Sequence, residues 1–93
     1  MGKLDPLLHQ ELRLAVVSYL ANVEQADFKK LLEVTEASKG NLSVQIKKLQ
    51  KANYITITKS FKGNYPHTAC AITVPGREAL ENYVQNLKQL LNL

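Results

Sequence analysis

The sequence has a single cysteine, no tryptophan and no long apolar run. A lone cysteine, Cys70, cannot form a disulfide within the chain, which is typical of proteins in a reducing compartment. No stretch approaches the ~20 consecutive apolar residues that a membrane-spanning helix needs, and the first residues lack the pattern of a secretory signal. We therefore expect a cytoplasmic protein without a membrane partner.

Motifs for catalysis and for metal binding are also missing. The sequence contains no glycine-rich phosphate loop, no HExxH and no nucleophile paired with a base in a recognised motif. His9, His67 and Cys70 are not grouped with further ligands at the spacing that metal sites use. We expect neither an enzyme nor a bound metal or cofactor, and we expect Cys70 to be a small core residue.

The most informative absence is that of acidic residues between Ala37 and Gly76. This stretch holds six lysines and no Asp or Glu, whereas the rest of the chain carries all eight acids and six basic residues. Such an uneven distribution favours a polyanionic partner, with a merely solvated surface as the alternative. The lysines are Lys39, Lys47, Lys48, Lys51, Lys59 and Lys62.

Apolar spacing predicts a helix near each end of the chain. Asp5 and Pro6 can form the N-cap and the first turn of a helix over residues 5–21. Thr73 can cap a last helix over residues 74–92, which carries a long apolar seam with the spacing of a packed helix pair. Because a domain this small has few surfaces to cover that seam, we expect both terminal helices to form a dimer interface.

Between the terminal helices the sequence predicts a helix-turn-helix. A short helix is expected from Glu24 or Asp27 to Glu33, and a second one over residues 38–52 with Ser38 as its N-cap. In such a unit the second helix lies in the major groove of DNA and presents its N-terminal part to base edges. The helix over 38–52 is therefore the candidate recognition helix.

This candidate recognition helix is amphipathic. Leu42, Ile46 and Leu49 fall on one face, which is expected to be buried. The opposite face is small, polar and basic, and the N-terminus of a helix favours an anion. The residues expected at DNA are Ser38, Lys39, Gly40, Asn41, Ser43, Val44, Lys47, Lys48 and Lys51.

After the recognition helix the period changes to that of strands. Residues 54–58 alternate and are rich in β-branched side chains, residues 62–66 contain turn formers, and residues 67–74 are typical of a returning strand. The resulting hairpin has a basic tip over 59–67 that can reach a phosphate backbone or the adjacent minor groove. The residues expected at DNA here are Lys59, Lys62, Asn64, Tyr65 and His67.

Several of these residues allow a second interpretation. Val44 can contact a thymine methyl group or be a singly exposed apolar residue. Asn41 can read adenine or stabilise the first helical turn. Lys47, Lys48 and Lys51 can bind phosphates or simply solvate the helix.

Four parts of the sequence carry a family resemblance: residues 38–43, residues 46–55, residues 4–9 with 12–14, and the closing Thr73-x-x-Gly76-Arg77-x-Ala79-Leu80. Taken together, in their order along the chain, these parts resemble small MarR/ArsR-like winged-helix regulators of bacteria and archaea. The resemblance covers nearly the whole chain. Asn53 stands where that family usually has glycine, and Asn also tolerates a left-handed backbone. Where the family's wing is often rich in arginine, this chain offers lysine, which favours phosphate contact.

The predicted elements and the resemblance agree on one α+β, mostly helical domain over residues 1–93. It is a winged helix-turn-helix with three helices, a two-stranded hairpin wing and a long C-terminal helix. The resemblance implies a homodimeric, sequence-specific transcriptional regulator that reads a pseudo-palindromic site in double-stranded DNA, with a small-molecule effector as a further candidate partner. The alternatives are a protein-interaction module without DNA binding and an RNA-binding domain. The residues expected at the dimer interface are Leu4, Leu7, Leu8, Leu80, Tyr83, Val84, Leu87, Leu90 and Leu91.

Overall fold

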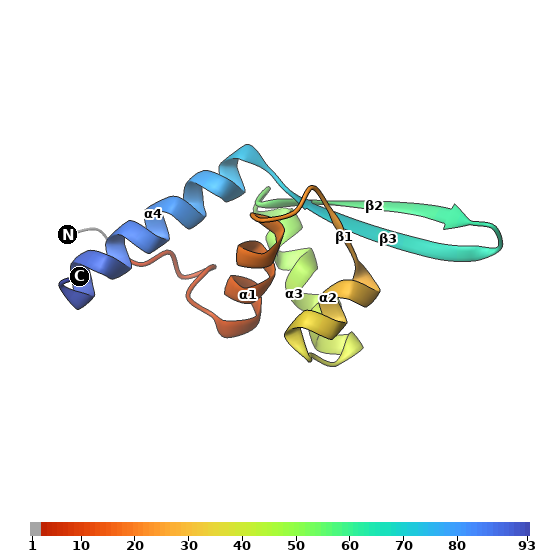
Figure 1. Cartoon of the computed structure of the whole chain (residues 1–93), viewed down its shortest axis with the longest axis horizontal. Coiled ribbons are helices and arrows are strands. Elements are labelled where there is room, and N and C mark those ends of the chain that lie inside the picture. The colour runs from red at the N-terminus through yellow and green to blue at the C-terminus, as the bar shows by residue number, and fades with distance from the viewer. Residues whose placement is uncertain (1–2) are drawn as a thin grey trace.

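In the computed structural model, which describes residues 3–93, four helices lie around one end of a small antiparallel sheet, whose hairpin projects away from them (Figure 1). The sheet has three strands in the order β1-β3-β2. The long helix α4 and the β2–β3 hairpin point to opposite ends of the molecule, whose longest dimension is 51 Å. This architecture confirms the predicted winged helix-turn-helix; Met1 and Gly2 of the expected domain lie outside the described residues. The elements are α1 (Glu11–Leu20), β1 (Ala26–Asp27), α2 (Phe28–Thr35), α3 (Lys39–Lys51), β2 (Ile55–Lys62), β3 (Tyr65–Ile72) and α4 (Val74–Leu91).

The first helix begins later than predicted. Asp5 caps only a single turn, in which its side chain accepts a hydrogen bond from the backbone N–H of Leu7 at 2.8 Å. The backbone is then extended at Gln10 (φ −152°, ψ 130°), which caps α1 with its own side chain. The prediction of one helix over 5–21 is therefore wrong. The extended residue frees Leu8 to be buried near α4, while α1 faces the other helices.

The two helices of the helix-turn-helix lie close to their predicted bounds. α2 follows Asp27, one of the two predicted starts, and ends at Thr35 rather than Glu33. Ser38 caps α3 as predicted, because its hydroxyl oxygen accepts a hydrogen bond from the N–H of Asn41 at 3.1 Å.

The end of α3 depends on a left-handed residue. Asn53 has φ +63°, the left-handed conformation that glycine adopts easily and that Asn also tolerates. Its N–H bonds to the Gln50 carbonyl and the N–H of Tyr54 bonds to the Leu49 carbonyl, both at 2.9 Å. This pair of bonds satisfies carbonyls that the helix leaves free, and it turns the chain directly into β2.

The hairpin is longer and its turn tighter than predicted. β2 and β3 have eight residues each, and Lys62 pairs with Tyr65. The loop is therefore Gly63 and Asn64 alone rather than residues 62–66. Gly63 has φ +63° while Asn64 does not have a positive φ, which is typical of a type II′ hairpin turn.

The short strand β1 was not predicted. It pairs Ala26 with Cys70 and Asp27 with Ala69 of β3. A strand of two residues shows no alternation in sequence, so no period reveals it.

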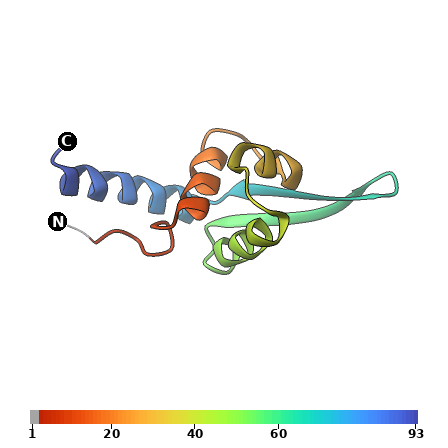
Figure 2. The same ribbon diagram turned by 90° about the horizontal axis from the view of Figure 1, so that it is seen from below.

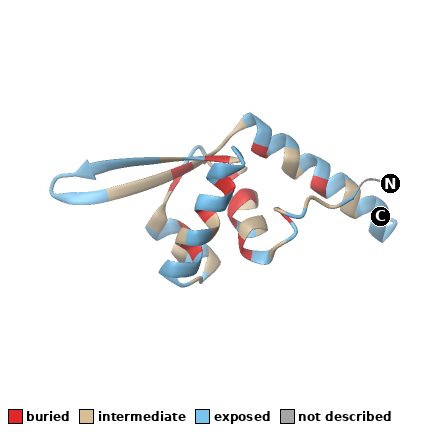
Figure 3. Cartoon of the chain, turned by 180° about the vertical axis from the view of Figure 1, so that it is seen from behind, coloured by how far each residue is buried: buried red, intermediate tan, exposed pale blue. Residues whose placement is uncertain are grey.

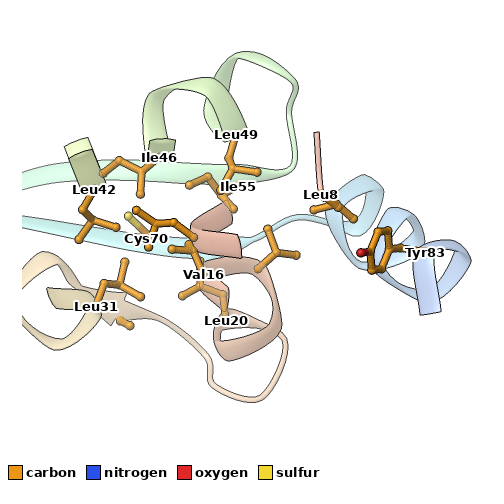
Figure 4. Close-up of a cluster of buried hydrophobic side chains, with 13 residues drawn as sticks. Leu8, Val16, Leu20, Leu31, Leu42, Ile46, Leu49, Ile55, Cys70 and Tyr83 are labelled. Atoms are coloured by element: carbon orange, nitrogen blue, oxygen red, sulfur yellow. The ribbon is translucent and has the colours of Figure 1, made fainter. Parts of the chain in front are cut away.

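The core lies where α1, α2 and α3 meet the root of the hairpin (Figure 4). Leu31, Leu42 and Val16 are fully buried there, and Cys70 is 1% exposed, which confirms the prediction of a core cysteine. Burial ends part-way along the hairpin, whose outer half is exposed (Figure 3).

A second, smaller group of contacts joins the N-terminal segment to α4. Leu8 and Tyr83 are both buried, and the Tyr83 hydroxyl lies 3.0 Å from Nδ1 of His9. Farther along, Nδ2 of Asn86 donates to the carbonyl of Lys3 at 3.2 Å. Figure 2 shows the N-terminal segment from Lys3 onward running alongside α4.

The start of α4 is fixed by a close backbone contact. Thr73 caps α4 as predicted, and its N–H donates to the Tyr54 carbonyl at 3.0 Å. The hydroxyl of Thr73 donates to the Asn53 carbonyl at 2.6 Å and accepts from the N–H of Gly76. Gly76 is buried so closely against Tyr54 that a Cβ atom would lie 2.1 Å from the Tyr54 carbonyl oxygen. The end of α3 and the start of α4 thus form one rigid joint. No helix within residues 3–93 combines the length and the apolar character that crossing a membrane requires.

Candidate nucleic-acid interface

α3 is held by one face and presents the other to solvent. Leu42 and Leu49 are fully buried and Ile46 is 4% exposed, so the orientation of the helix about its axis is fixed. Val44, on the opposite face, is 50% exposed. Of the residues predicted at DNA on this helix, Ser43 is half-buried; the exposed ones are Ser38, Lys39, Gly40, Asn41, Val44, Lys47, Lys48 and Lys51.

A groove of about 560 Å³ separates α3 from the root of the hairpin. Ser43 and Lys47 line it from α3, and Lys59 lines it from β2. Two lysines from different elements therefore face one space, which suits a phosphate group better than either lysine alone. Gln50 also lines this groove. It was not among the predicted site residues, although it lies three residues after Lys47 on the same side of the helix.

A second groove, of about 590 Å³, lies between the hairpin and the starts of α2 and α3. Lys29, Lys39 and His67 line it together with Asp27. His67 is therefore not at the tip of the wing, and its Nε2 lies 3.4 Å from Oδ2 of Asp27. The hydrogen bond from the N–H of Lys30, at 2.7 Å, holds the pKa of Asp27 below its ordinary value, and His67 acts in the same direction.

The far end of the hairpin carries the rest of the predicted wing residues. Lys62, Asn64 and Tyr65 are exposed around the turn, away from α3 (Figure 1). Phe61, which the sequence analysis left out, is 75% exposed and Tyr65 is 77% exposed. Phe61 pairs with Pro66 in the register, next to the Lys62–Tyr65 pair, so the tip offers aromatic and cationic surface.

The side of α3 away from the hairpin is tied to α1. Nη1 of Arg13 donates to Oε1 of Gln45 at 2.5 Å, and Nε2 of Gln45 donates to Oδ1 of Asn41 at 3.0 Å. Nε of Arg13 donates to the carbonyl of Leu7 at 2.6 Å. Arg13 and Gln45 were not among the predicted site residues, because nothing in the sequence indicates that a residue of the first helix meets the third.

The residues predicted at a dimer interface fall into three groups: buried, exposed and partly buried. Leu8 and Tyr83 are buried within their own chain and have no surface left to share. Val84 is 39% exposed, and Leu90 and Leu91 are 53% and 56% exposed. The members that pack partly against the core are Leu4, Leu7, Leu80 and Leu87.

Comparison with known proteins identifies the family to which this chain belongs. The family model of the winged helix DNA-binding domain matches residues 12–91. The chain belongs to this family. Uncharacterized protein MJ0432 of Methanocaldococcus jannaschii is 29% identical over 84 residues, which cover 90% of this chain and 91% of that protein.

Solved structures share the winged-helix fold over most of this chain. A transcriptional regulator homologue from Pyrococcus horikoshii OT3 has a TM-score of 0.85 at 24% identity, covering 92% of this chain and 85% of that one. A cysteine-to-serine variant of MarR from E. coli, complexed with operator DNA, has a TM-score of 0.74 at 17% identity, covering 95% and 68%. The predicted resemblance to small MarR-like winged-helix regulators is confirmed by the shared fold, and the family that the chain matches is that of a winged helix DNA-binding domain.

Proposed function

We propose that this winged-helix domain regulates transcription as a homodimer that binds double-stranded DNA sequence-specifically. α3 enters the major groove, and the wing over 59–67 follows the phosphate backbone. The observation that carries the proposal is the exposed, acid-free face of α3 beside a hairpin that adds lysines of its own.

The shape of α3 suits a major groove. An α-helix with its side chains is about 10–12 Å across, and the major groove of B-DNA is ~12 Å wide. The outward residues near the N-terminus of α3, Gly40 and Asn41, are small, so the backbone can approach the base edges closely. Lys47, Lys48 and Lys51 lie farther along, where phosphates flank the groove.

The wing is assigned to the backbone rather than to the minor groove. Its cations, Lys59 and Lys62, are lysines, whose single ammonium group binds a phosphate as a point charge. Lys59 shares its groove with Lys47 of α3, so one phosphate position can contact both elements. His67 supports this surface less directly, because it lies against Asp27.

Dimerisation is proposed through α4. Leu90 and Leu91 are more than half exposed near its end, and burying a leucine fully contributes about 1.5–3 kcal/mol. Packing this end of α4 against its counterpart would remove both leucines from water in each subunit. Two α3 helices would then face DNA with two-fold symmetry, and the half-sites would lie about one helical turn apart.

The proposal is tested by the salt dependence of DNA binding. Fluorescence anisotropy with a duplex selected from a random pool measures Kd at several salt concentrations. Each phosphate that the protein neutralises adds about 0.9 to the slope of log K against log salt. Changing Lys47→Glu and Lys48→Glu together is expected to abolish binding at physiological salt without unfolding the protein.

A matched control distinguishes a specific DNA-binding site on α3 from a general effect of the protein's net charge. The double change Lys3→Glu and Lys88→Glu lowers the net charge of +4 by the same amount, but lies on the N-terminal segment and α4, away from the hairpin. Because Lys88 lies close to Leu90 and Leu91, sedimentation equilibrium checks that this variant is still a dimer, and the dimer is expected to keep most of the affinity. Equal losses in both double variants, or salt-insensitive binding by the unaltered protein, would disprove the assignment to α3.

The dimer has its own test. Sedimentation equilibrium is expected to give a dimer for the unaltered protein and a monomer after Leu90→Glu and Leu91→Glu. Val74→Glu is the control, because Val74 is 71% exposed at the opposite end of the same helix. A monomeric unaltered protein, or a dimer that survives both leucine changes, would argue against α4 as the interface.

A further inference from the structure

A line of hydrogen bonds runs from the N-terminal segment to the exposed face of α3. It begins at the carbonyl of Leu7, passes through the guanidinium of Arg13 and the amide of Gln45, and ends on the amide of Asn41. The three links measure 2.6, 2.5 and 3.0 Å. Arg13 and Gln45 are half-buried, whereas Asn41 is exposed in the first turn of α3.

The direction of this line is fixed by its arginine. A guanidinium can only donate hydrogen bonds, so Gln45 must turn its oxygen Oε1 toward Arg13. The NH2 group of Gln45 then points on to Asn41, where it can be received only by the oxygen Oδ1. A side-chain amide without partners can rotate by 180° and so exchange the positions of its oxygen and its NH2 group. Here the arginine, which can only donate, determines the orientation of both amides.

We propose that Arg13, acting through Gln45, sets the hydrogen-bonding polarity of Asn41, so that α3 offers an NH2 donor to the base edge. The inference rests on the proposed function and gives it a chemical preference. Oδ1 of Asn41 is engaged by Gln45, and its backbone N–H is engaged by Ser38. The group left to face DNA is Nδ2, at a position in the helix where recognition helices contact bases.

The donors and acceptors that each base presents in the major groove determine which base an outward NH2 group of Asn41 prefers. Guanine presents two acceptors there, N7 and O6, and thymine presents the acceptor O4, whereas cytosine presents only the N4 donor. Adenine presents one acceptor and one donor, and reading both of its groups calls on the asparagine oxygen as well. Asn41 is therefore expected to favour guanine, accept thymine and reject cytosine by roughly 5- to 100-fold in Kd.

The decisive variant is Gln45→Glu. A carboxylate at this position still accepts from Arg13, but it can no longer donate to Asn41. Asn41 gains a hydrogen bond by turning its NH2 group inward, which leaves Oδ1 to face DNA. The preferred base at the affected position is then expected to change from guanine or thymine to cytosine or adenine. Because this change adds a negative charge, overall affinity falls as well, so the readout is the ratio of Kd values between bases.

Further variants identify the position and the role of Arg13. Selection from a random duplex pool is carried out with the full chain. Asn41→Ala is expected to remove the preference at one position of each half-site. Arg13→Met, which keeps an unbranched side chain but has no hydrogen-bond donor, is expected to weaken the preference at that same position. Lys48→Met is the control: it is expected to weaken binding to all sequences alike and to leave base preference unchanged.

The outcomes separate this inference from the proposed function. If the unaltered protein selects no duplex, the proposed function fails and the inference fails with it. If it selects a symmetric motif, and Gln45→Glu and Arg13→Met both keep its preference at every position, the inference alone is overturned. Thermal unfolding of each variant confirms that it is folded. Should Arg13→Met fail to fold, the reversal by Gln45→Glu decides alone, because that variant keeps its partner Arg13.

Discussion

Replacing Gly76 with alanine tests the tightest contact in the fold. A Cβ atom there would lie 2.1 Å from the carbonyl oxygen of Tyr54 and 2.9 Å from its carbonyl carbon. Both atoms are backbone, so no side chain can rotate out of the way. The start of α4 must move away from Tyr54 instead, which also stretches the hydrogen bond from the Thr73 N–H to the Tyr54 carbonyl.

The expected magnitude follows from three effects. Overpacking a tight site costs about 1–3 kcal/mol, and a weakened backbone hydrogen bond costs about 0.5–1.5 kcal/mol. Alanine recovers about 0.5–1 kcal/mol over glycine within a helix. We therefore expect Gly76→Ala to lower the free energy of unfolding by about 2 kcal/mol. For a domain of this size that lowers Tm by about 8–16 °C.

Gly40 supplies a matched control. It also lies in the first turn of a helix, but nothing stands within 4 Å of the place where its Cβ would be. Gly40→Ala should therefore leave Tm unchanged or raise it. Thermal unfolding followed by circular dichroism measures both variants under the same conditions. A Tm for Gly76→Ala equal to or above that of the unaltered protein would refute the reasoning.

Three further predictions concern single side chains. Tyr54 donates a hydrogen bond to Oδ2 of Asp5 at 2.5 Å, which raises the pKa of Tyr54 to about 12. The stability that this bond contributes, about 1 kcal/mol, should be present below pH ~10 and lost as pH rises toward about 12. Urea titrations at a series of pH values should show this loss in the unaltered protein but not in Tyr54→Phe. The hydrogen bond from the N–H of Lys30 is the main cause of the lowered pKa of Asp27. The stability that this charge contributes is therefore present above the ordinary aspartate pKa and lost as acid is added. Asp27→Asn should reduce this acid-induced loss of the free energy of unfolding, whereas Asp27→Ala should also lose the cap of α2, about 1 kcal/mol. Burial raises the pKa of the Cys70 thiol to about 11, so the native protein at pH ~8 should react with a thiol reagent far more slowly than the protein unfolded in denaturant; equal rates would show that Cys70 is accessible.

The parts of the fold that the sequence predicted well depend on neighbours along the chain. Ser38 caps α3 through a bond to the N–H of Asn41, three residues away. Leu42, Ile46 and Leu49 share a face because of helical periodicity alone. The start of α3 and its buried face were therefore visible in the sequence.

The features that escaped prediction depend on residues far apart in sequence. The turn after Asp5 ends before α1 because Leu8 and His9 meet Tyr83 of α4. Residues that bury each other across such a distance leave no period, and the same holds for Leu8 and Tyr83, which the apolar pattern assigned to a partner subunit. Whether the remaining leucines of α4 pair with a second chain stays a prediction.

The candidate interface shows the same division. Its lysines were evident from charge alone, since no acid interrupts them. The connection from Arg13 to Asn41 was not, because it crosses between two helices. The position of His67 beside Asp27 also depends on β1, a strand too short to predict.

The wing has a consequence for how much binding free energy it can deliver. Beyond its root the hairpin has no buried side chains, and Phe61 and Tyr65 are three-quarters exposed. A two-stranded ribbon without a core is only marginally stable on its own, so we expect the outer part of the wing to open and close locally while the domain stays folded. If the wing binds DNA as proposed, part of the attraction between its lysines and the phosphates is used to order the ribbon. In the proposed complex we therefore expect the wing to adapt to grooves of different width and to add less affinity than its charges alone would suggest.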